Sequence, residues 1–191
     1  MRIAKGKSGY IQSKKKWEIT KTCLEFGMVL AVFLTGYFTT KTRLNLLTVA
    51  AVLGCLPAAK ALVGVIMLFP HHSMEREKVE EIEGKAPTLV KAYDMILTSY
   101  EKIMPIDSIV IFENIVCGYS GSNKIDVNDT ASYIKKMLRN NQYDKVSVKI
   151  FTDYKTYMTR VEGMENMAVA ERKSSQEHEE GIRRTILSLS M

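Results

Sequence analysis

The sequence predicts a two-helix transmembrane hairpin followed by a small cytosolic domain of the α/β (α+β) class. Two observations predict the hairpin: residues 22–39 and 44–69 carry almost no charge, and only residues 40–43 separate them. A third observation predicts the domain, because after Pro70 charged and apolar residues alternate with helix and strand periods. The element order expected after the hairpin is α-β-β-α-β-α-α.

The basic residues are concentrated at the N-terminal end of the 191-residue chain, which has a net charge of +6. Residues 1–21 hold seven Lys/Arg against one Glu, residues 22–69 hold three against one, and residues 70–191 hold 17 against 19 acids. The sequence pI of 9.1 therefore reflects the tail and the hairpin. It does not indicate a basic domain, so we expect no nucleic-acid partner.

The two apolar stretches are long enough to span a bilayer. Residues 44–69 would extend about 39 Å as a helix, more than the roughly 30 Å hydrocarbon core, so we expect a tilt or a bend at Pro57. A buried hairpin in a soluble protein is the alternative, but only 122 residues remain to cover it. A cleaved signal peptide is a second alternative, which the lack of a small-residue cleavage site disfavours.

The basic flanks predict the orientation of the hairpin. Residues 1–21 hold seven basic residues, the loop Thr40–Arg43 holds two, and the stretch after the second span holds Arg76, Lys78 and Lys85. We therefore expect a multi-pass protein of the cell membrane with both termini in the cytoplasm. The expected organisation is a basic tail (1–21), the hairpin (22–69), a charged linker (70–85) and the cytosolic domain (86–191).

Each span carries one charge, Glu25 in the first and Lys60 in the second. Measured from the outer ends of the spans, their depths differ by about 5 Å, so an intramembrane ion pair is geometrically easy. Two alternatives stay open: both side chains extend to the inner interface, or they belong to an ion or proton pathway.

Two further features concern packing and anchoring. Ala50, Gly54 and Ala58 form a small-residue stripe for close helix packing, which predicts a homo-oligomer through the second span; ordinary alanine content explains the stripe almost as well. Lys14, Lys15, Lys16 and Trp17 predict anchoring at an interface with anionic lipids. The positive-inside rule alone would also require these lysines.

The cytosolic domain is expected to contain three strands and four helices. Residues 86–102 are predicted as a helix opened by Pro87, and residues 107–112 and 115–119 as a strand hairpin. A helix over 130–139 follows capping side chains from Asp126 onward, and a third strand covers 146–151. A short helix over 153–161 and a helix from 164 to the end, weakened at Gly181, complete the domain. Its last turns carry an apolar stripe (Ile182, Ile186 and Leu189) that we expect to cover the sheet, so residues 86–191 should fold as a separable unit.

No catalytic or metal-binding motif stands out, and we expect no cofactor. The stretch Gly118–Ser122 lacks the second glycine of a nucleophile elbow, and Asp126–Met137 lacks the glycine and the acid of a calcium loop. The adjacent His71 and His72 have no ligand partner at a zinc spacing. The three cysteines, Cys23, Cys55 and Cys117, are scattered, as in proteins of a reducing compartment.

Two classes of function follow. The first is a membrane-anchored interaction or regulatory domain that binds an unidentified cytosolic protein. The alternative is a membrane-tethered enzyme, nuclease-like or transferase-like. A nuclease of the Asp…Glu-x-Lys type has a similar strand and helix order, although the strand at 146–151 offers Lys149 without the acid. The polar residues that such an enzyme could use are Asp107, Glu113, Asp126, Lys149 and Asp153.

Four runs carry a resemblance to a known family: NLLTVAAVLGCLPAAKALVGVIML (45–68), SIVIFENIVCGYS (108–120), DVNDTASYIKKML (126–138) and VSVKIFTDYKTYMTRVEGM (146–164). Together they resemble a family of uncharacterised two-span membrane proteins of clostridial Gram-positive bacteria, along most of the chain. Members are sometimes labelled O-linked GlcNAc transferase-like, but these residues contain neither that enzyme's repeats nor its nucleotide-sugar site. The resemblance implies a bacterial membrane protein and assigns no catalytic residue.

Overall fold

The computed structural model describes residues 3–41, 46–99, 102–122, 125–171 and 176–190. The chain divides into two compact units. The hairpin unit is Ile11–His72, and the α+β domain combines Met1–Tyr10 with Ser73–Met191. Each unit has its own packing.

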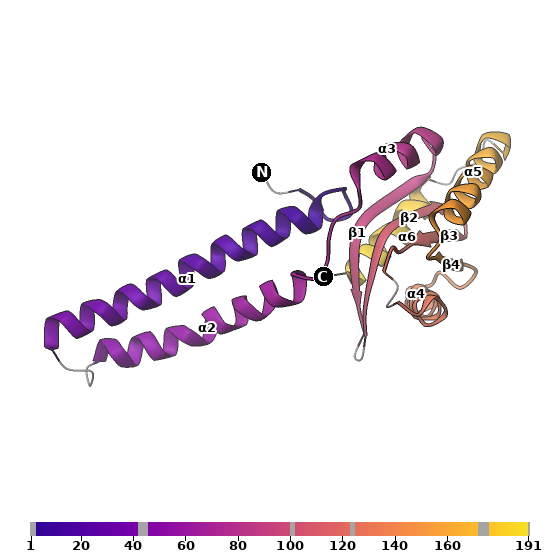
Figure 1. Ribbon diagram of the computed structural model, residues 1–191. Coiled ribbons are helices and arrows are strands. Elements are labelled where there is room, and N and C mark those ends of the chain that lie inside the picture. Colours follow the sequence, from indigo (N-terminus) through magenta and orange to yellow (C-terminus); the bar gives the residue numbers. More distant parts are fainter. Residues whose placement is uncertain (1–2, 42–45, 100–101, 123–124, 172–175, 191) are drawn as a thin grey trace. The chain divides into compact units, whose positions relative to one another are not determined.

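The hairpin consists of helix α1 (Tyr10–Thr40) and helix α2 (Leu46–Leu68), which lie side by side in Figure 1. Both are long and apolar enough to cross a membrane. The expected tail is not separate from the first span, because residues 10–21 continue the same helix. Pro57 lies inside α2. The expected loop at 40–43 falls largely outside the described residues.

Small residues bring the two helices of the hairpin together. A Cβ added to Gly54 would lie 3.0 Å from Cγ2 of Val29 on α1. Ala51, Ala58 and Ala61 are buried on the same helix, although most apolar side chains of the hairpin are exposed. The close approach of α1 and α2 therefore depends on residues of α2 that have little or no side chain.

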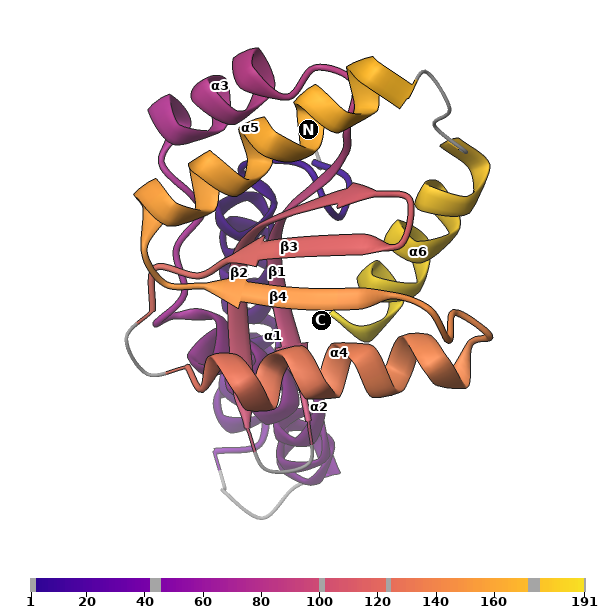
Figure 2. The ribbon, with the colours of Figure 1, turned by 90° about the vertical axis from the view of Figure 1, so that its right-hand side faces the viewer.

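The α+β domain is built on a mixed four-stranded sheet with the order β1-β2-β3-β4. Strands β1 (Val90–Thr98), β2 (Ile103–Phe112) and β3 (Ile115–Tyr119) are antiparallel, whereas β4 (Ser147–Phe151) is parallel to β3. A parallel pair needs a crossover, which helix α4 (Val127–Asn140) provides. Helices α3 (Arg76–Lys85) and α5 (Tyr154–Glu171) cover one face, and α4 and α6 (Gln176–Leu189) cover the other (Figure 2).

A separate hydrophobic core lies on each face of the sheet. The α3/α5 core is centred on Ile82, Val110, Tyr157, Val161 and Met164. The α4/α6 core is centred on Ile106, Ile111, Ile134, Leu138 and Ile182. Because both faces are covered, residues of either parity are buried in β1, β2 and β3, and these strands show little alternation between apolar and polar residues.

This two-sided burial explains why the prediction of a helix over 86–102 is wrong. Most of that stretch is β1, and its apolar residues from Ala92 to Leu97 are buried. A continuous apolar run of this length fits a buried helix and a buried strand equally well. Leu89, Tyr93 and Ile96 happen to fall at helical spacing, and Pro87 precedes the strand instead of opening a helix.

The expected charged linker at 70–85 also needs correction. Helix α3 occupies most of it, and Val79 and Ile82 of α3 lie in the α3/α5 core. Exposed acidic and basic side chains form ion pairs along the rest of the helix, among them Arg76–Glu80 and Lys85–Glu81. The charge run is therefore the solvated face of an amphipathic helix.

The other predicted elements agree with the structure apart from their boundaries. The strands expected at 107–112, 115–119 and 146–151 correspond to β2, β3 and β4, and the helix at 130–139 corresponds to α4. The expected break near residue 162 is wrong, because α5 continues to Glu171; Gly181 lies within α6. The predicted cover for the sheet is confirmed, since Ile182 and Ile186 are fully buried in the α4/α6 core.

Both ends of the chain close the outer edge of β1. The Tyr93 N–H donates to the carbonyl of Gly6 (2.9 Å), and the Ile96 N–H donates to Oγ of Ser190 (3.3 Å). Lys5 also donates to the carbonyl of Ser190. Because an open edge strand invites pairing with other chains, these contacts protect the sheet on this side.

Candidate functional site

The five polar residues expected to serve an enzyme do not converge. Glu113 follows the last residue of β2, whereas the half-buried Asp107 lies in the middle of that strand, and the Glu113 N–H donates to Glu179. Asp126 and Asp153 accept hydrogen bonds from N–H groups of the first turns of α4 and α5. The ammonium of Lys149 lies 5.1 Å from the ring centroid of Phe151. The contacts of Asp126, Asp153 and Lys149 are local, whereas that of Glu113 joins the end of β2 to α6.

A different pair of carboxylates meets inside the domain. Asp94 on β1 lies opposite Asp107 on β2, between the paired residues Tyr93–Ser108 and Met95–Ile106. Asp94 is 1% exposed and has a φ of 54°. Aspartate tolerates this left-handed conformation better than most residues, yet it is uncommon within a strand.

In both strands, the alternation of side chains between the two faces of the sheet shifts by one residue near this pair. In β1, Ala92 and Met95 both pack in the α4/α6 core although they lie an odd number of residues apart. In β2, Ile106 and Ile109 do the same. A regular strand alternates faces at every residue, so each strand shifts by one position next to an aspartate.

The surroundings of the pair are only partly polar. Oδ1 of Asp94 accepts from the Met74 N–H at 3.0 Å, whereas its buried Oδ2 has no hydrogen-bond partner among the described residues. Oδ2 of Asp107 accepts from the Gly121 N–H at 2.7 Å. Burial and the nearby Asp94 carboxylate raise the pKa of Asp107, against the opposing effects of Gly121 and Lys78.

The Tyr119 hydroxyl approaches the same place. A Cβ added to Gly121 would lie 3.2 Å from Oδ2 of Asp107 and 3.3 Å from the hydroxyl of Tyr119. Burial raises the pKa of Tyr119, and the hydrogen bond from Lys78 to Glu75 raises the pKa of Lys78. We call Asp94, Asp107, Tyr119 and Lys78 the aspartate-pair cluster.

Two neighbouring carboxyl groups with different surroundings can hold one proton between them, which is the arrangement used in general acid–base chemistry. The described part of the chain contains no group of three His, Cys, Asp or Glu side chains that could hold a metal ion. The cluster can therefore donate and accept a proton at Asp107, beside a tyrosine hydroxyl and a lysine.

Asp107 is among the polar residues that the sequence singles out, but the other three members of the cluster are not. Asp94 was hidden because its segment was assigned to a helix, and Lys78 because its helix was assigned to a linker. One signal was present in the sequence: Asp94 is the only charged residue between Ala92 and Leu97, an apolar run that proves to be buried. An acid at such a position needs an explanation.

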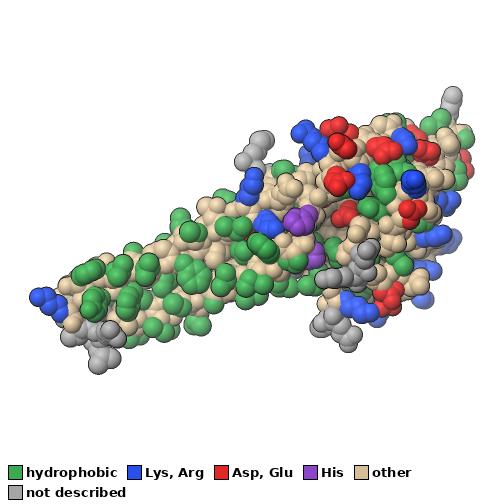
Figure 3. Space-filling view, in the orientation of Figure 1, with side chains coloured by type: hydrophobic (Ala, Val, Ile, Leu, Met, Phe, Trp, Pro, Cys, Tyr) green, Lys and Arg blue, Asp and Glu red, His purple; other side chains and the backbone are tan. Residues whose placement is uncertain are grey.

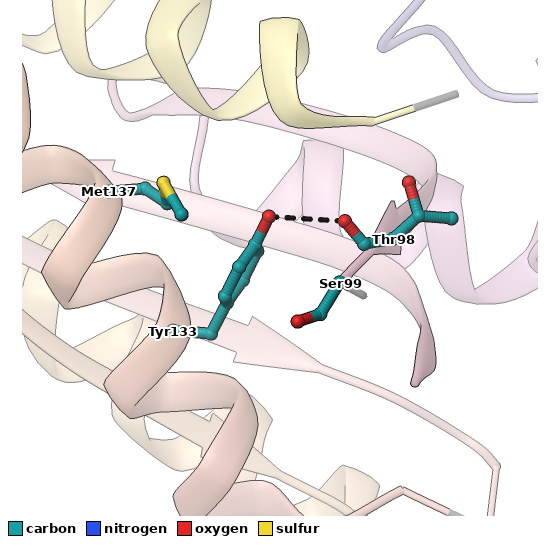
Figure 4. A pocket seen from close by; sticks show the side chains of 4 residues that line it. All are labelled: Thr98, Ser99, Tyr133 and Met137. Carbon is teal, nitrogen blue, oxygen red and sulfur yellow. Dashed lines mark hydrogen bonds between the residues drawn. The ribbon is translucent and has the colours of Figure 1, made fainter. Parts of the chain in front are cut away.

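A surface pocket of about 280 Å³ lies elsewhere in the domain, lined by Thr98, Ser99, Tyr133 and Met137 (Figure 4). The Tyr133 hydroxyl donates to the carbonyl of Thr98 at 3.1 Å and closes part of its wall. The lining holds no Asp, Glu, Lys, Arg or His, so the pocket offers shape and three hydroxyl groups.

In the hairpin, Glu25 has a different ion-pair partner from the one predicted. One of its oxygens lies 3.8 Å from the ammonium of Lys21, one helical turn earlier. Lys60 is exposed on α2, and the ion pairs among the described residues do not include Glu25 with Lys60. The other Glu25 oxygen is buried and has no hydrogen-bond partner in the described part of the chain.

The residues of the small-residue stripe differ in their surroundings. Ala58 is fully buried and Gly54 approaches Val29 on α1, so both serve the packing of α1 against α2. Ala50 is exposed. A second copy of the chain would therefore find only part of the stripe accessible.

The predicted anchoring residues lie near the start of α1. Trp17 is half exposed, and Lys15 reaches the end of α2, where its ammonium donates to the Phe69 carbonyl at 2.7 Å. Apolar side chains cover the surface of the long helices, basic side chains lie at both of their ends, and histidine side chains lie at one end (Figure 3). This end of the hairpin has the composition of a membrane interface.

Comparison with known proteins finds no match to a protein-family model, a curated protein or a solved structure.

Proposed function

We propose that this is a membrane protein of the bacterial cell envelope, anchored by the α1–α2 hairpin, whose α+β domain acts in the cytoplasm as an interaction or regulatory domain. The observation that supports this most directly is the exposure of apolar side chains on both helices. In the most apolar 18-residue stretch of each helix, only 11% is buried. Water would make such a surface unstable, whereas lipid tails would solvate it.

The proposed orientation places both termini in the cytoplasm, because basic residues are most frequent before and at the start of α1. The resemblance to the clostridial two-span family points to the same location. The partner that we propose for the domain is a cytosolic protein, with self-association through the exposed faces of α2 as a further contact.

Reporter fusions test the anchoring and the orientation together. A reporter that is active only in the cytoplasm, joined after residue 191, should be active, and the same reporter inserted at residues 42–45 should be silent. A reporter that is active only outside the cell should give the reverse pattern. Recovery of the untagged protein in the soluble fraction, or an active external reporter after residue 191, would contradict the proposal.

A second candidate function is a membrane-tethered enzyme, which the aspartate-pair cluster favours. A buried carboxylate beside a second carboxyl of raised pKa is typical of acid–base chemistry. Asp107→Asn would keep the shape of the site and remove its titrating group. If the purified protein cleaves labelled nucleic acid or transfers a group, this variant should lose the activity while its unfolding stays cooperative.

A further inference from the structure

Lys15, near the start of α1, contacts the chain at the end of α2. Its ammonium donates to the carbonyl of Phe69, just after the end of α2, and lies 4.4 Å from the centroid of the Phe69 ring. The helix dipole and the ring both favour a cation at this position. Lys15 is therefore held beside the segment that follows α2.

Two histidines occupy that segment. His71 is partly buried, and its N–H donates to the carbonyl of Leu68 (3.2 Å), which keeps the segment close to the end of α2. The charged groups that act on the His71 ring are His72 and Lys15, both of them bases. Burial, His72 and Lys15 together lower the pKa of His71.

Among the described residues, none of the groups that shift the pKa of His71 is an anion. Lys14 and Lys16 add two more cations on the same turn of α1, and Trp17 follows directly. A negative group placed beside Lys15 would reverse the electrostatic cost of a proton on His71. The chemistry therefore calls for an anion at the level of a bilayer interface.

We propose that Lys15, His71 and His72 form a binding site for the phosphate group of an anionic phospholipid, and that binding places a proton on His71. This inference rests on the proposed membrane anchoring and adds a specific lipid class and a dependence on pH. The protein would hold anionic lipids more firmly as the pH of the cytoplasm falls.

Trp17 permits a direct test because it is the single tryptophan of the chain. The full-length protein is reconstituted into bilayers that contain either phosphatidylglycerol or phosphatidylcholine with a quencher on the headgroup, at equal mole fraction. The ratio of the two quenching efficiencies measures the local preference for the anionic lipid. The phosphate diester of phosphatidylglycerol stays ionised throughout, so changes with pH come from the protein.

We expect phosphatidylglycerol to quench more strongly, and the preference to rise about fivefold between about pH 8 and about pH 6, which is the factor for one cation gained near an anionic surface. The double substitution His71→Gln and His72→Gln should remove the rise with pH. Lys15→Gln should lower the preference at both pH values. Lys41→Asn removes a lysine that lies just after the end of α1, 26 residues from Lys15, keeps a side chain suited to its φ of 53°, and should leave the rise with pH unchanged.

The outcomes separate this inference from the anchoring proposal. Equal quenching by both lipids would support insertion and overturn the lipid site. A rise with pH that survives in the double histidine variant would overturn the role of the histidines. Loss of the preference on adding inorganic phosphate, but not chloride of equal ionic strength, would mean that free phosphate is the ligand and would overturn the lipid assignment. An absence of quenching by either lipid would contradict the anchoring itself.

Discussion

The hairpin and the α+β domain place their apolar side chains in opposite environments. On the hairpin, Val52 and Leu56 are 63% and 69% exposed, whereas Ile82 and Met164 of the domain are fully buried. The domain covers both faces of its sheet with its own helices, and the hairpin buries little beyond the contact between α1 and α2. The domain therefore supplies its own apolar interior, while the hairpin needs one supplied by its surroundings.

The largest expected effect concerns where the domain begins. A chain in which a flexible linker replaces residues 11–72 should be soluble and unfold cooperatively. Removing residues 73–85 as well should abolish cooperative unfolding, because it deletes Met74, Val79 and Ile82 from the α3/α5 core. Loss of one large core side chain costs about 2–5 kcal/mol, against a total stability of about 5–15 kcal/mol.

Chemical denaturation followed by circular dichroism would measure this difference. The single variant Ile82→Ala, made in the hairpin-deleted chain, should lower the free energy of unfolding by about 2–5 kcal/mol. Ile103→Ala serves as the control because Ile103 is exposed. Cooperative unfolding of the shorter chain, with unchanged stability, would restore the prediction that residues 70–85 are a linker.

The next effect tests the packing of the hairpin. Gly54→Ile should separate α1 from α2, because even a Cβ at this position would lie 3.0 Å from Val29. We expect a loss of about 1–3 kcal/mol, the usual cost of overpacking. Thermal unfolding in detergent measures it, and Val52→Ile on the exposed side of α2 should have little effect. Equal effects of the two substitutions would mean that Gly54 does not lie at the contact.

The two regions also differ in how far the sequence predicts them. The hairpin follows from local composition alone, because long apolar stretches with a single charge, such as Leu46–Leu68, have few alternatives. In the domain, strands β2 and β3 were predictable from their β-rich composition and the short turn between them. Strand β1 was not, because burial on both faces removes the alternation that distinguishes a strand from a helix.

The candidate site could not be predicted for the same reason, because it depends on strand β1. Asp107 could be selected from its polarity, but its partner Asp94 comes from β1, and only strand pairing brings the two together. Likewise, the contact of Lys15 with the Phe69 carbonyl joins residues 54 positions apart. Such proximity is a product of tertiary structure and leaves no local pattern.

The aspartate-pair cluster gives a smaller effect with a defined sign. The pKa of Asp107 is raised in the folded domain, so its contribution to stability is present below its ordinary pKa of 3.8 and is lost as the pH rises through the raised value. Asp107→Asn should therefore stabilise the hairpin-deleted chain at neutral pH, because it removes a carboxyl whose ionisation burial disfavours. The gain should vanish in acid, where the wild-type carboxyl is protonated.

Asp153→Asn is the matched control, because hydrogen bonds from the Thr156 side chain and N–H lower the pKa of Asp153. Its contribution is present above the ordinary pKa and is lost as the pH falls through the lowered value, so this variant should be destabilised at neutral pH. Thermal unfolding across the pH range measures both. If the two variants respond to pH in the same direction, burial does not disfavour the ionised form of Asp107, and the prediction fails.

The smallest expected effect distinguishes two partners for Glu25. The sequence favours Lys60 because the two charges lie at similar depths, whereas the structure places Lys21 3.8 Å from the carboxylate. A pair one helical turn apart with half-exposed side chains contributes about 0.3–0.5 kcal/mol. Double-mutant cycles that combine Glu25→Gln with Lys21→Gln or with Lys60→Gln, followed by thermal unfolding in lipid nanodiscs, separate the two couplings.

We expect a small coupling of Glu25 with Lys21 and none with Lys60. The reason is covalent geometry: residues four apart on one helix stay neighbours whatever the tilt between α1 and α2, whereas a pair across the hairpin requires both side chains to turn toward each other. Charge reversal adds an independent criterion. Glu25→Lys should lower the amount of folded protein, and adding Lys60→Glu should not restore it. Restoration, together with a larger coupling to Lys60, would show that the bilayer selects the pair across the hairpin, since an isolated charge in lipid costs far more than one near water.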